Sequence, residues 1–236
     1  MDQAVATVAE FLQAGGAHHV VTADTSAVVM AQHDHELREI IERAALVTPD
    51  SFGVTWAARR LGHPLPERVT GVDLMARLCA HCATSGHRIY LLGAAPGVAE
   101  AAAERLCARF PGLRVVGTHH GYFQPEEEEG IIAEIAASGA DLLFVAFGIP
   151  RQEKWIARHL ERLGVRVAIG VGGSLDVFSG RVQRAPRWVQ RANLEWLDRL
   201  LRNPRKISKV KTLPVLVWLT LAAMLRGTEG ARHRGR

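Results

Sequence analysis

Two aspartates stand immediately after apolar stretches that predict buried strands. Asp50 follows the residues LVTP, and Asp24 follows VVTA. A carboxylate at the end of a strand can face a bound substrate and remove a proton from it as a general base. The alternative for each is a helix N-cap, Asp50 for a helix beginning at Phe52 and Asp24 for one beginning at Thr25. Of the two, Asp50 is the leading candidate for chemistry.

Glycine-containing loops follow three further predicted strands, over residues 93–97, 148–153 and 170–173. Open α/β sheets bind their ligands at the carboxyl ends of the strands. The loops lack the complete G-x-G-x-x-G spacing of a dinucleotide oxidoreductase and the G-x-x-x-x-G-K-[ST] spacing of a P-loop NTPase. Backbone N–H groups at a helix N-terminus hold a phosphate without either motif. Gly93 is therefore a candidate for binding a phosphorylated substrate, with a plain tight turn as the alternative.

Apolar runs alternate with amphipathic segments, a pattern typical of a parallel sheet covered by helices. The sequence predicts a Rossmann-like α/β domain over residues 1–180, with helices on both faces of the sheet. Six strands are expected, over residues 19–22, 45–48, 88–92, 114–117, 142–147 and 165–170. Eight helices are expected, over residues 2–13, 25–32, 35–43, 52–61, 72–84, 96–109, 126–137 and 152–163.

The composition is that of a folded protein from a reducing compartment. The 236 residues are 48% hydrophobic and 22% charged, enough for one large domain and an appendage. Three cysteines cannot form a disulfide framework, and Cys79 and Cys82 are expected to be half-buried thiols inside a helix. The histidine pairs lack neighbours at metal-ligand spacing. We expect no metal and no cofactor.

The basic excess of the chain, which has a formal charge of +5, lies almost entirely after Gly180. This change in composition predicts a separate appendage over residues 181–236, with a helical pattern from residue 187 to 202. Three arginines of this region share one face if it is helical: Arg184, Arg187 and Arg191. The apolar stretch Leu213–Leu225 is too short to span a bilayer and is flanked by cations. It predicts a helix lying on an anionic membrane surface.

Two other interpretations of the appendage stay open. In the first, the appendage is a solvated basic helix that packs on the domain. In the second, it is a segment that binds nucleic acid. The second is disfavoured because the sequence contains no helix-turn-helix, RNP-like aromatic motif or zinc finger, so no nucleic-acid partner is expected. The first residues do not have the pattern of a signal peptide. Together with the membrane interpretation of the appendage, we expect a peripheral protein on the cytoplasmic face of the plasma membrane.

Ordered blocks of the sequence, from about Val20 to Pro204, resemble the WecG/TagA/CpsF glycosyltransferase family. These blocks are PDSFGVTWAARRLGHPLPERVTGVDL, LLGAAPGVAEAAAERL, FPGLRVVGTHHGYF, DLLFVAFGIPRQEKWI and GVGGSLDVFSGRVQRAPRWVQRANLEWLDRLLRNPRK. The resemblance implies an inverting, metal-independent transferase with a Rossmann-like fold. It implies a UDP-sugar donor carrying an N-acetylmannosamine-type residue, and an undecaprenyl-diphosphate-linked amino sugar as acceptor. The product belongs to a cell-surface polymer.

The resemblance also implies roles for individual residues. Asp50 is the base that deprotonates the acceptor hydroxyl, and Thr22 lies beside the donor sugar or its diphosphate. Further residues are expected to bind the donor or the leaving group: Arg68, Gln152 and Glu153. The appendage is expected to place its arginines over the site, where they hold a diphosphate: Arg184, Arg187 and Arg191.

Two positions depart from the family pattern. The family commonly has asparagine at the position of Asp24 and glycine at that of Ser51. The hypothesis that follows is that Asp24, as a substrate-binding residue, retunes donor choice or the pH optimum without replacing the base. A membrane-bound nucleotide-sugar-binding protein that has lost catalysis is the alternative, and an oxidoreductase acting on nucleotide sugars is a second rival. A homo-oligomer is compatible with the sequence.

Overall fold

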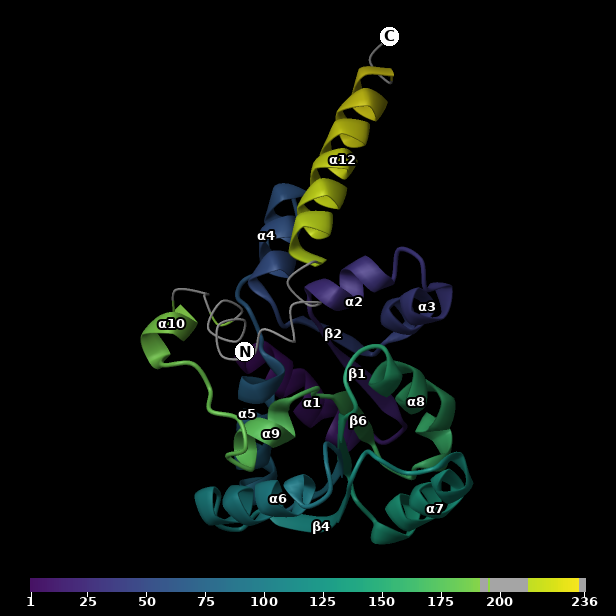
Figure 1. Ribbon diagram of the computed structural model, residues 1–236, viewed down its shortest axis with the longest axis vertical. Coiled ribbons are helices and arrows are strands. Elements are labelled where there is room, and N and C mark those ends of the chain that lie inside the picture. The colour runs from purple at the N-terminus through teal and green to yellow at the C-terminus, as the bar shows by residue number, and fades with distance from the viewer. Residues whose placement is uncertain (192–194, 196–211, 234–236) are drawn as a thin grey trace.

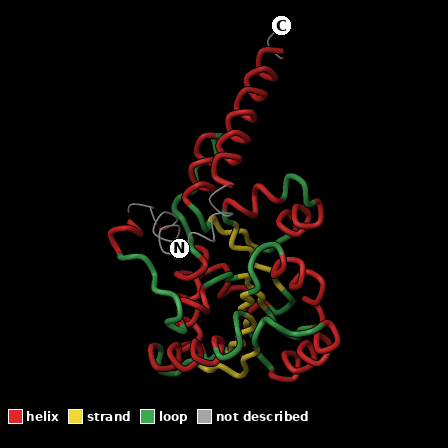
Figure 2. The backbone as a smooth tube through the Cα atoms, viewed as in Figure 1, coloured by secondary structure: helices red, strands yellow, loops and turns green. Residues whose placement is uncertain are grey.

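The computed structural model, which describes residues 1–191, 195 and 212–233, is built on one six-stranded sheet (Figures 1 and 2). The strands are β1 (His18–Ala23), β2 (Leu46–Pro49), β3 (Arg88–Gly93), β4 (Arg114–His119), β5 (Leu142–Ala146) and β6 (Val167–Gly170). Their order across the sheet is β2-β1-β6-β5-β3-β4, and every neighbouring pair is parallel. The six predicted strands and the parallel α/β class are confirmed.

Helices cover both faces of this sheet because alternate strand residues point to opposite sides. In β3, Ile89 and Leu91 belong to one buried cluster, whereas Tyr90 and Leu92 belong to another. The first cluster includes residues of α1 (Asp2–Ala14), α5 (Gly71–Ser85), α6 (Val98–Arg109) and α9 (Ser174–Phe178). The second includes residues of α7 (Glu128–Ser138) and α8 (Arg151–His159). The expected arrangement of helices on two faces is thus confirmed.

The remaining helices of the domain are α2 (Thr25–Met30), α3 (His35–Arg43) and α4 (Phe52–Arg60). All eight predicted helices are present, with short 3-10 turns at Pro125–Glu127 and Leu160–Arg162 beside α7 and α8. The five-residue α9 was not predicted. Cys79 and Cys82 lie in α5 as expected but are fully buried, not half-buried, and burial raises the pKa of both thiols.

Two helices of the C-terminal region are described, α10 (Arg187–Arg191) and α12 (Thr212–His233). The rest of the helix predicted to residue 202 lies outside the described residues, apart from Glu195. Arg184 precedes α10, so the condition for it to share a helical face with Arg187 and Arg191, a helix that includes all three, is not met. The expected helix over Leu213–Leu225 is confirmed as part of α12. In the described part of the chain, no helix has the combination of length and apolar character that crossing a membrane requires.

α12 packs against α2 and α4 and then projects away from the sheet, as Figure 1 shows. Its inner face buries Leu216 and Thr220. The contact is close because α4 has a glycine there. A β-carbon on Gly53 would lie 3.0 Å from Leu216 Cδ2 and 2.5 Å from the Thr25 hydroxyl at the start of α2. The glycine therefore lets three helices meet next to the residues that follow β1 and β2.

Candidate active site

The carboxyl ends of β1, β2 and β6 bring together residues that we call the strand-end cluster: Thr22, Asp50, Gly71 and Gly170. The Thr22 hydroxyl donates a 2.7 Å hydrogen bond to the Gly170 carbonyl, which joins β1 to β6. Asp50 follows β2, and its Oδ1 accepts a 3.0 Å hydrogen bond from the N–H of Gly71, the first residue of α5. A β-carbon on Gly71 would lie 3.5 Å from the Thr22 hydroxyl, so the start of α5 lies directly against Thr22.

Strand register places the two aspartates side by side. Ala23 of β1 is paired with Pro49 of β2, and Asp24 and Asp50 are the residues that follow this pair. The Asp50 N–H donates a 2.9 Å hydrogen bond to the Ala23 carbonyl, which continues the pairing past the end of β2. The two aspartates therefore follow the sheet at neighbouring backbone positions, and their joint contact with one ligand stays a prediction.

The N-cap alternative has a different outcome for each aspartate. Asp24 does cap α2, because its Oδ1 accepts a 3.0 Å hydrogen bond from the N–H of Ala27. For Asp50 the alternative is wrong, since α4 is capped by Ser51, whose hydroxyl accepts from the N–H of Val54. Asp50 instead holds the first N–H of α5. Its carboxylate thus connects β2 to a helix that begins at residue 71, and it does so at the ligand edge of the sheet.

Gln152 and Glu153 lie behind the loops that follow β5 and β6, with exposed fractions of only 1% and 0%. The Gln152 side-chain oxygen accepts hydrogen bonds from the N–H groups of Gly148, at 3.0 Å, and Gly172, at 3.1 Å. Its amide nitrogen donates to Glu153 Oε1 at 2.8 Å. These bonds fix the two loops to each other. The role supported by this geometry is positioning, and direct contact of either residue with a donor stays a prediction.

Gly93 allows β3 and the loop after it to approach β5 closely. Its φ is +126°, and an added β-carbon would lie 2.6–2.8 Å from backbone atoms of Ala146. The next residue, Ala94, also has a positive φ, of +59°. It donates from its N–H to the Ala146 carbonyl and accepts from the N–H of Gly121. The turn before α6 is therefore fixed by hydrogen bonds to the end of β5 and to the segment after β4. Its contact with a phosphate stays a prediction.

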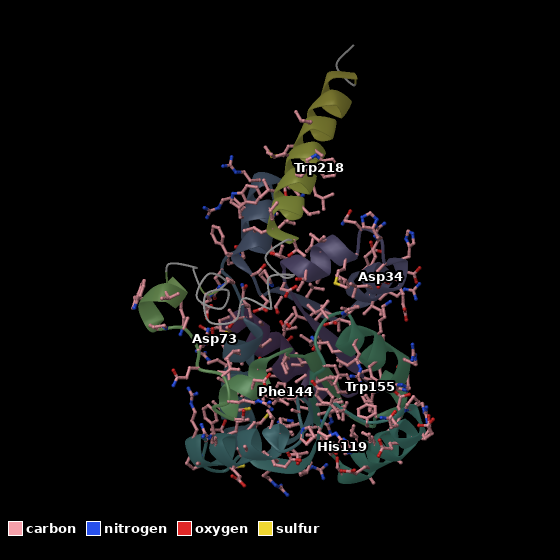
Figure 3. All side chains as sticks on the ribbon, viewed as in Figure 1. Asp34, Asp73, His119, Phe144, Trp155 and Trp218 are labelled. Carbon is pink, nitrogen blue, oxygen red and sulfur yellow. The ribbon has the colours of Figure 1, made fainter. Side chains whose placement is uncertain are left out.

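Arg68 and Arg184 are joined by one carboxylate. Arg68 donates to Glu195 Oε2 at 2.7 Å, and Arg184 donates to Glu195 Oε1 at 3.1 Å. Arg184 also forms a two-pronged pair with Asp73 of α5, at 2.5 and 2.8 Å. Figure 3 labels Asp73 on this side of the molecule, between the sheet and α10. The structure therefore brings two predicted site residues together beside the start of α5, each already neutralised by an acidic partner.

The Arg184–Asp73 pair sets the protonation of both groups. Hydrogen bonds from the Arg184 guanidinium, more than any other cause, hold the pKa of Asp73 below its usual value, and the Thr70 hydroxyl adds to the effect. The same pair raises the pKa of Arg184. Both groups are thus ionised at neutral pH, and the pair fastens residue 184, and with it the start of the C-terminal region, to α5.

In the Asp73→Asn variant, the free energy of unfolding is expected to decrease less between pH 6 and pH 3 than it does in the unmodified protein. A carboxyl whose pKa is lower in the folded than in the unfolded protein stabilises the fold above its unfolded pKa, and this contribution is lost as the pH falls below about 4. Because the Asp73 side chain is 43% exposed, we expect only about 0.5–1 kcal/mol. Urea unfolding at pH 6 and near pH 3 measures the effect. Equal acid sensitivity in the two proteins would show that the pair contributes nothing.

Arg187 and Arg191 are the first and last residues of α10, and their side chains are outside the described part of the structure. Their expected contact with a diphosphate therefore stays a prediction. The described residues contain no group of three or more histidine, cysteine, aspartate or glutamate side chains suited to hold a metal ion. Helix N-termini do lie at the ligand edge, those of α5, α6 and α8. Their N–H groups attract an anion such as a diphosphate.

Three residues of this region were missed in the sequence: Gly71, Asp73 and Glu195. Thr70 and Asp73 are spaced as in a capping box, and Thr70 does cap α5, so this signal at the start of α5 was readable. No comparable sequence pattern indicated that the Gly71 N–H or the Glu195 carboxylate would contact a site residue. Their partners are 21 and 127 residues away, at Asp50 and Arg68. Only the folded chain brings them together.

A parallel α/β sheet with carboxylate, hydroxyl and helix N-termini at one edge defines a ligand-binding enzyme fold of the open-sheet class. Comparison with known proteins makes this specific. Residues 1–230 match the model of the "Glycosyl transferase WecG/TagA/CpsF family". The chain belongs to that family and is a glycosyltransferase.

Curated relatives share about a third of their residues with this chain. One from Staphylococcus aureus (strain MRSA252) is 35% identical over 199 residues, which is 84% of this chain and 78% of the relative. Another, from Bacillus spizizenii, is 35% identical over 202 residues, 86% of this chain and 78% of the relative. Both are named N-acetylglucosaminyldiphosphoundecaprenol N-acetyl-beta-D-mannosaminyltransferase. The resemblance seen in the sequence is thereby confirmed.

Proposed function

We propose that this glycosyltransferase moves an N-acetylmannosamine-type sugar from a UDP-sugar to a polyprenyl-diphosphate-linked sugar, with inversion at the anomeric carbon. The named activity of the relatives supports this acceptor class. The observation that carries the catalytic part is the position of Asp50, which is held by the Gly71 N–H against the start of α5 and beside Thr22. A carboxylate fixed in this way is oriented for use as a base.

In the proposed step, the acceptor hydroxyl oxygen attacks the anomeric carbon of the donor. The Asp50 carboxylate takes the hydroxyl proton, a new carbon–oxygen bond forms, and the bond from the anomeric carbon to the diphosphate breaks. The electron pair of that bond leaves on UDP. Attack from the face opposite the diphosphate inverts the configuration. Thr22, whose hydroxyl is held by Gly170, supports the wall of the site next to the base.

The departing diphosphate needs donors or positive charge. The N-termini of α5, α6 and α8 supply N–H groups at the ligand edge. Arg68 and Arg184 supply charge only if their carboxylate partners give way or stay attached through other nitrogens, because Glu195 and Asp73 hold them in this structure. We infer that a bound diphosphate competes with Glu195 for Arg68, while the pair with Asp73 keeps Arg184 in place.

The transferase proposal is tested by incubating the full-length protein with a panel of UDP-sugars and a lipid-diphosphate amino-sugar acceptor. Release of UDP that depends on the acceptor, with one donor preferred, is the expected result. UDP-sugar binding in a calorimeter without any transfer would favour the rival, a nucleotide-sugar-binding protein that has lost catalysis. The absence of both binding and transfer would contradict the proposal.

Asp24→Asn tests the hypothesis that Asp24 retunes the site. Asparagine is as good an N-cap as aspartate, so the cap of α2 persists and stability changes by less than about 0.5 kcal/mol. Removing one of two neighbouring carboxylates is expected to shift the pH–rate profile or the donor preference. Rates with each donor are measured from pH 5 to 9, with thermal unfolding as the control for folding. If the variant and the unmodified enzyme have identical pH–rate profiles and the same donor preference, the hypothesis is wrong.

We further propose that the C-terminal region, with residue 180 as the boundary, holds the enzyme on the cytoplasmic face of an anionic membrane. α12 supports this, because it exposes Val215, Trp218 and Leu221 on the face opposite its buried residues. An apolar face flanked by cations is typical of an interfacial helix. Vesicle flotation of the full chain and of a chain ending at Arg202 tests the proposal. Equal flotation of the two chains would contradict it.

A further inference from the structure

We propose that α4 and the residues after it, 52–66, form a second membrane-contacting element that acts together with α12. This inference rests on the proposed membrane role of α12. It adds a segment of the catalytic domain itself to the surface that meets the lipid. The observations that carry it are the two-sided structure of α4, its contact with α12 and its charge.

α4 has an inner and an outer face. Gly53 and Ala57 are buried, and Gly53 lies against Leu216 of α12. Phe52, Trp56 and Arg60 follow one another at intervals of four residues and therefore form a stripe on another face of the helix. Phe52 is 48% exposed, and the Arg60 guanidinium lies 5.8 Å from the centre of the Trp56 ring. The outer stripe is thus aromatic with a cation at its end.

The same division is found in α12. Leu216 and Thr220 are buried one helical turn apart, whereas Trp218 and Leu225 have exposed fractions of 65% and 68%. In Figure 1 the two helices lie side by side and point away from the sheet in the same direction, and they are in contact. Figure 3 labels Trp218 on α12. The chain after α4 continues the apolar character with the exposed Leu61 and Leu65.

Charge identifies the partner as a lipid surface. Residues 51–66 contain Arg59, Arg60 and His63 but no aspartate or glutamate, and residues 212–228 likewise have no acidic residue. Arg59 and Arg60 lie in the last turn of α4. Two segments with exposed leucine and aromatic side chains, with cations and with no carboxylate of their own, match an anionic bilayer surface, where apolar groups enter the interface and cations meet phosphates. Tryptophan is enriched at that depth.

Contact of α4 with lipid has a consequence for the reaction. α4 begins two residues after Asp50, and its nine residues span only about 14 Å. Membrane contact at Arg60 therefore keeps the strand-end cluster within a short distance of the headgroups. A sugar carried by a membrane-anchored diphosphate can then reach Asp50 while its lipid stays in the bilayer. α4 is in this sense the connection between the lipid surface and the site.

The test compares binding of full-length variants to vesicles of phosphatidylcholine with about one third phosphatidylglycerol. Arg59→Gln/Arg60→Gln is expected to weaken binding about fivefold for each arginine at low salt. Leu61→Ser/Leu65→Ser is expected to weaken it roughly tenfold. The matched control is Arg105→Gln/Arg109→Gln, which removes the same charge from exposed positions of α6, at the other end of the molecule in Figure 1. The control variant should bind as the unmodified protein does. Circular dichroism verifies that each variant is folded.

The other outcomes separate this inference from the proposals on which it rests. If the α4 variants bind normally and Trp218→Ser/Leu225→Ser does not, α12 alone meets the membrane and the inference is overturned. If the α6 control loses as much binding as Arg59→Gln/Arg60→Gln, net charge explains the effect and the inference also fails. If Leu61→Ser/Leu65→Ser dissociates an oligomer in lipid-free buffer, the surface binds a second copy of the chain instead. If the unmodified protein does not bind vesicles, the membrane role fails, whereas UDP release with a short, water-soluble acceptor still tests the transferase proposal.

Discussion

Asp50→Asn is expected to lower the rate of sugar transfer by a factor of about 10²–10⁴, the usual contribution of a general base. Asparagine has nearly the same shape, and its side-chain oxygen can still accept the hydrogen bond from the Gly71 N–H that holds Asp50 now. The start of α5 should therefore stay in place. What is lost is the negative oxygen that takes the proton of the acceptor. We expect the loss in kcat, with UDP-sugar binding retained within about threefold because the base acts only in the chemical step.

The measurement is acceptor-dependent UDP release at saturating donor, with donor affinity taken from calorimetry. Asp34→Asn is the matched control, because the Asp34 carboxylate, like that of Asp50, accepts a hydrogen bond from an N–H in the first turn of a helix, but it pairs with Lys154 away from the strand-end cluster. That variant should keep kcat within about twofold, since it only weakens a surface ion pair. If Asp50→Asn retains more than a tenth of the activity, Asp50 is not the base. If donor binding is lost together with kcat, Asp50 has a binding or structural role instead.

The positions of the strands and helices were predictable from the sequence because the apolar runs of this chain are short and are separated by amphipathic helical segments. Each predicted strand overlaps an observed one, and the ends differ by at most two residues. The strand order β2-β1-β6-β5-β3-β4 was not predicted. A buried parallel strand is apolar on both faces, so its residues do not specify its neighbours. The five-residue α9 was missed for a related reason, since one turn of helix carries too little periodicity to be recognised.

The residues of the candidate site also fall into those that the sequence revealed and those that it did not. Residues directly after strands, such as Thr22 and Asp50, were found because strand ends meet at one edge of a parallel sheet. Partners supplied by distant segments were not found. Arg184 was expected to face a diphosphate, and its spacing in sequence could not reveal that Asp73, 111 residues away, holds it with two hydrogen bonds. Gln152 illustrates the third case. Its position in the loop was readable, but its burial behind Gly148 and Gly172 depends on the packing of two loops.

Gly93→Ala is expected to destabilise the fold by about 2–5 kcal/mol for two reasons that can be separated. A residue with a β-carbon pays about 1–2 kcal/mol for a positive φ. Where the new carbon must displace its neighbours, the fold loses about 1–3 kcal/mol more. At Gly93 both apply, because φ is +126° and the carbon would lie 2.6 Å from the Ala146 carbonyl oxygen. β3 and β5 are central neighbours in the sheet, so this backbone cannot move aside without loss of strand hydrogen bonds.

Gly97→Ala is the matched control for Gly93→Ala, because Gly97 lies in the same loop with a φ of +80° and a β-carbon there would meet nothing within 4 Å. It should lose only the conformational part, about 1–2 kcal/mol. Urea unfolding of both variants isolates the cost of the contact with Ala146 as the difference between them, provided that the m-value is unchanged. Equal losses would mean that β3 and β5 separate freely at this point. The loop after β3 would then be adaptable, and a fixed phosphate-binding turn at Gly93 would lose its structural basis.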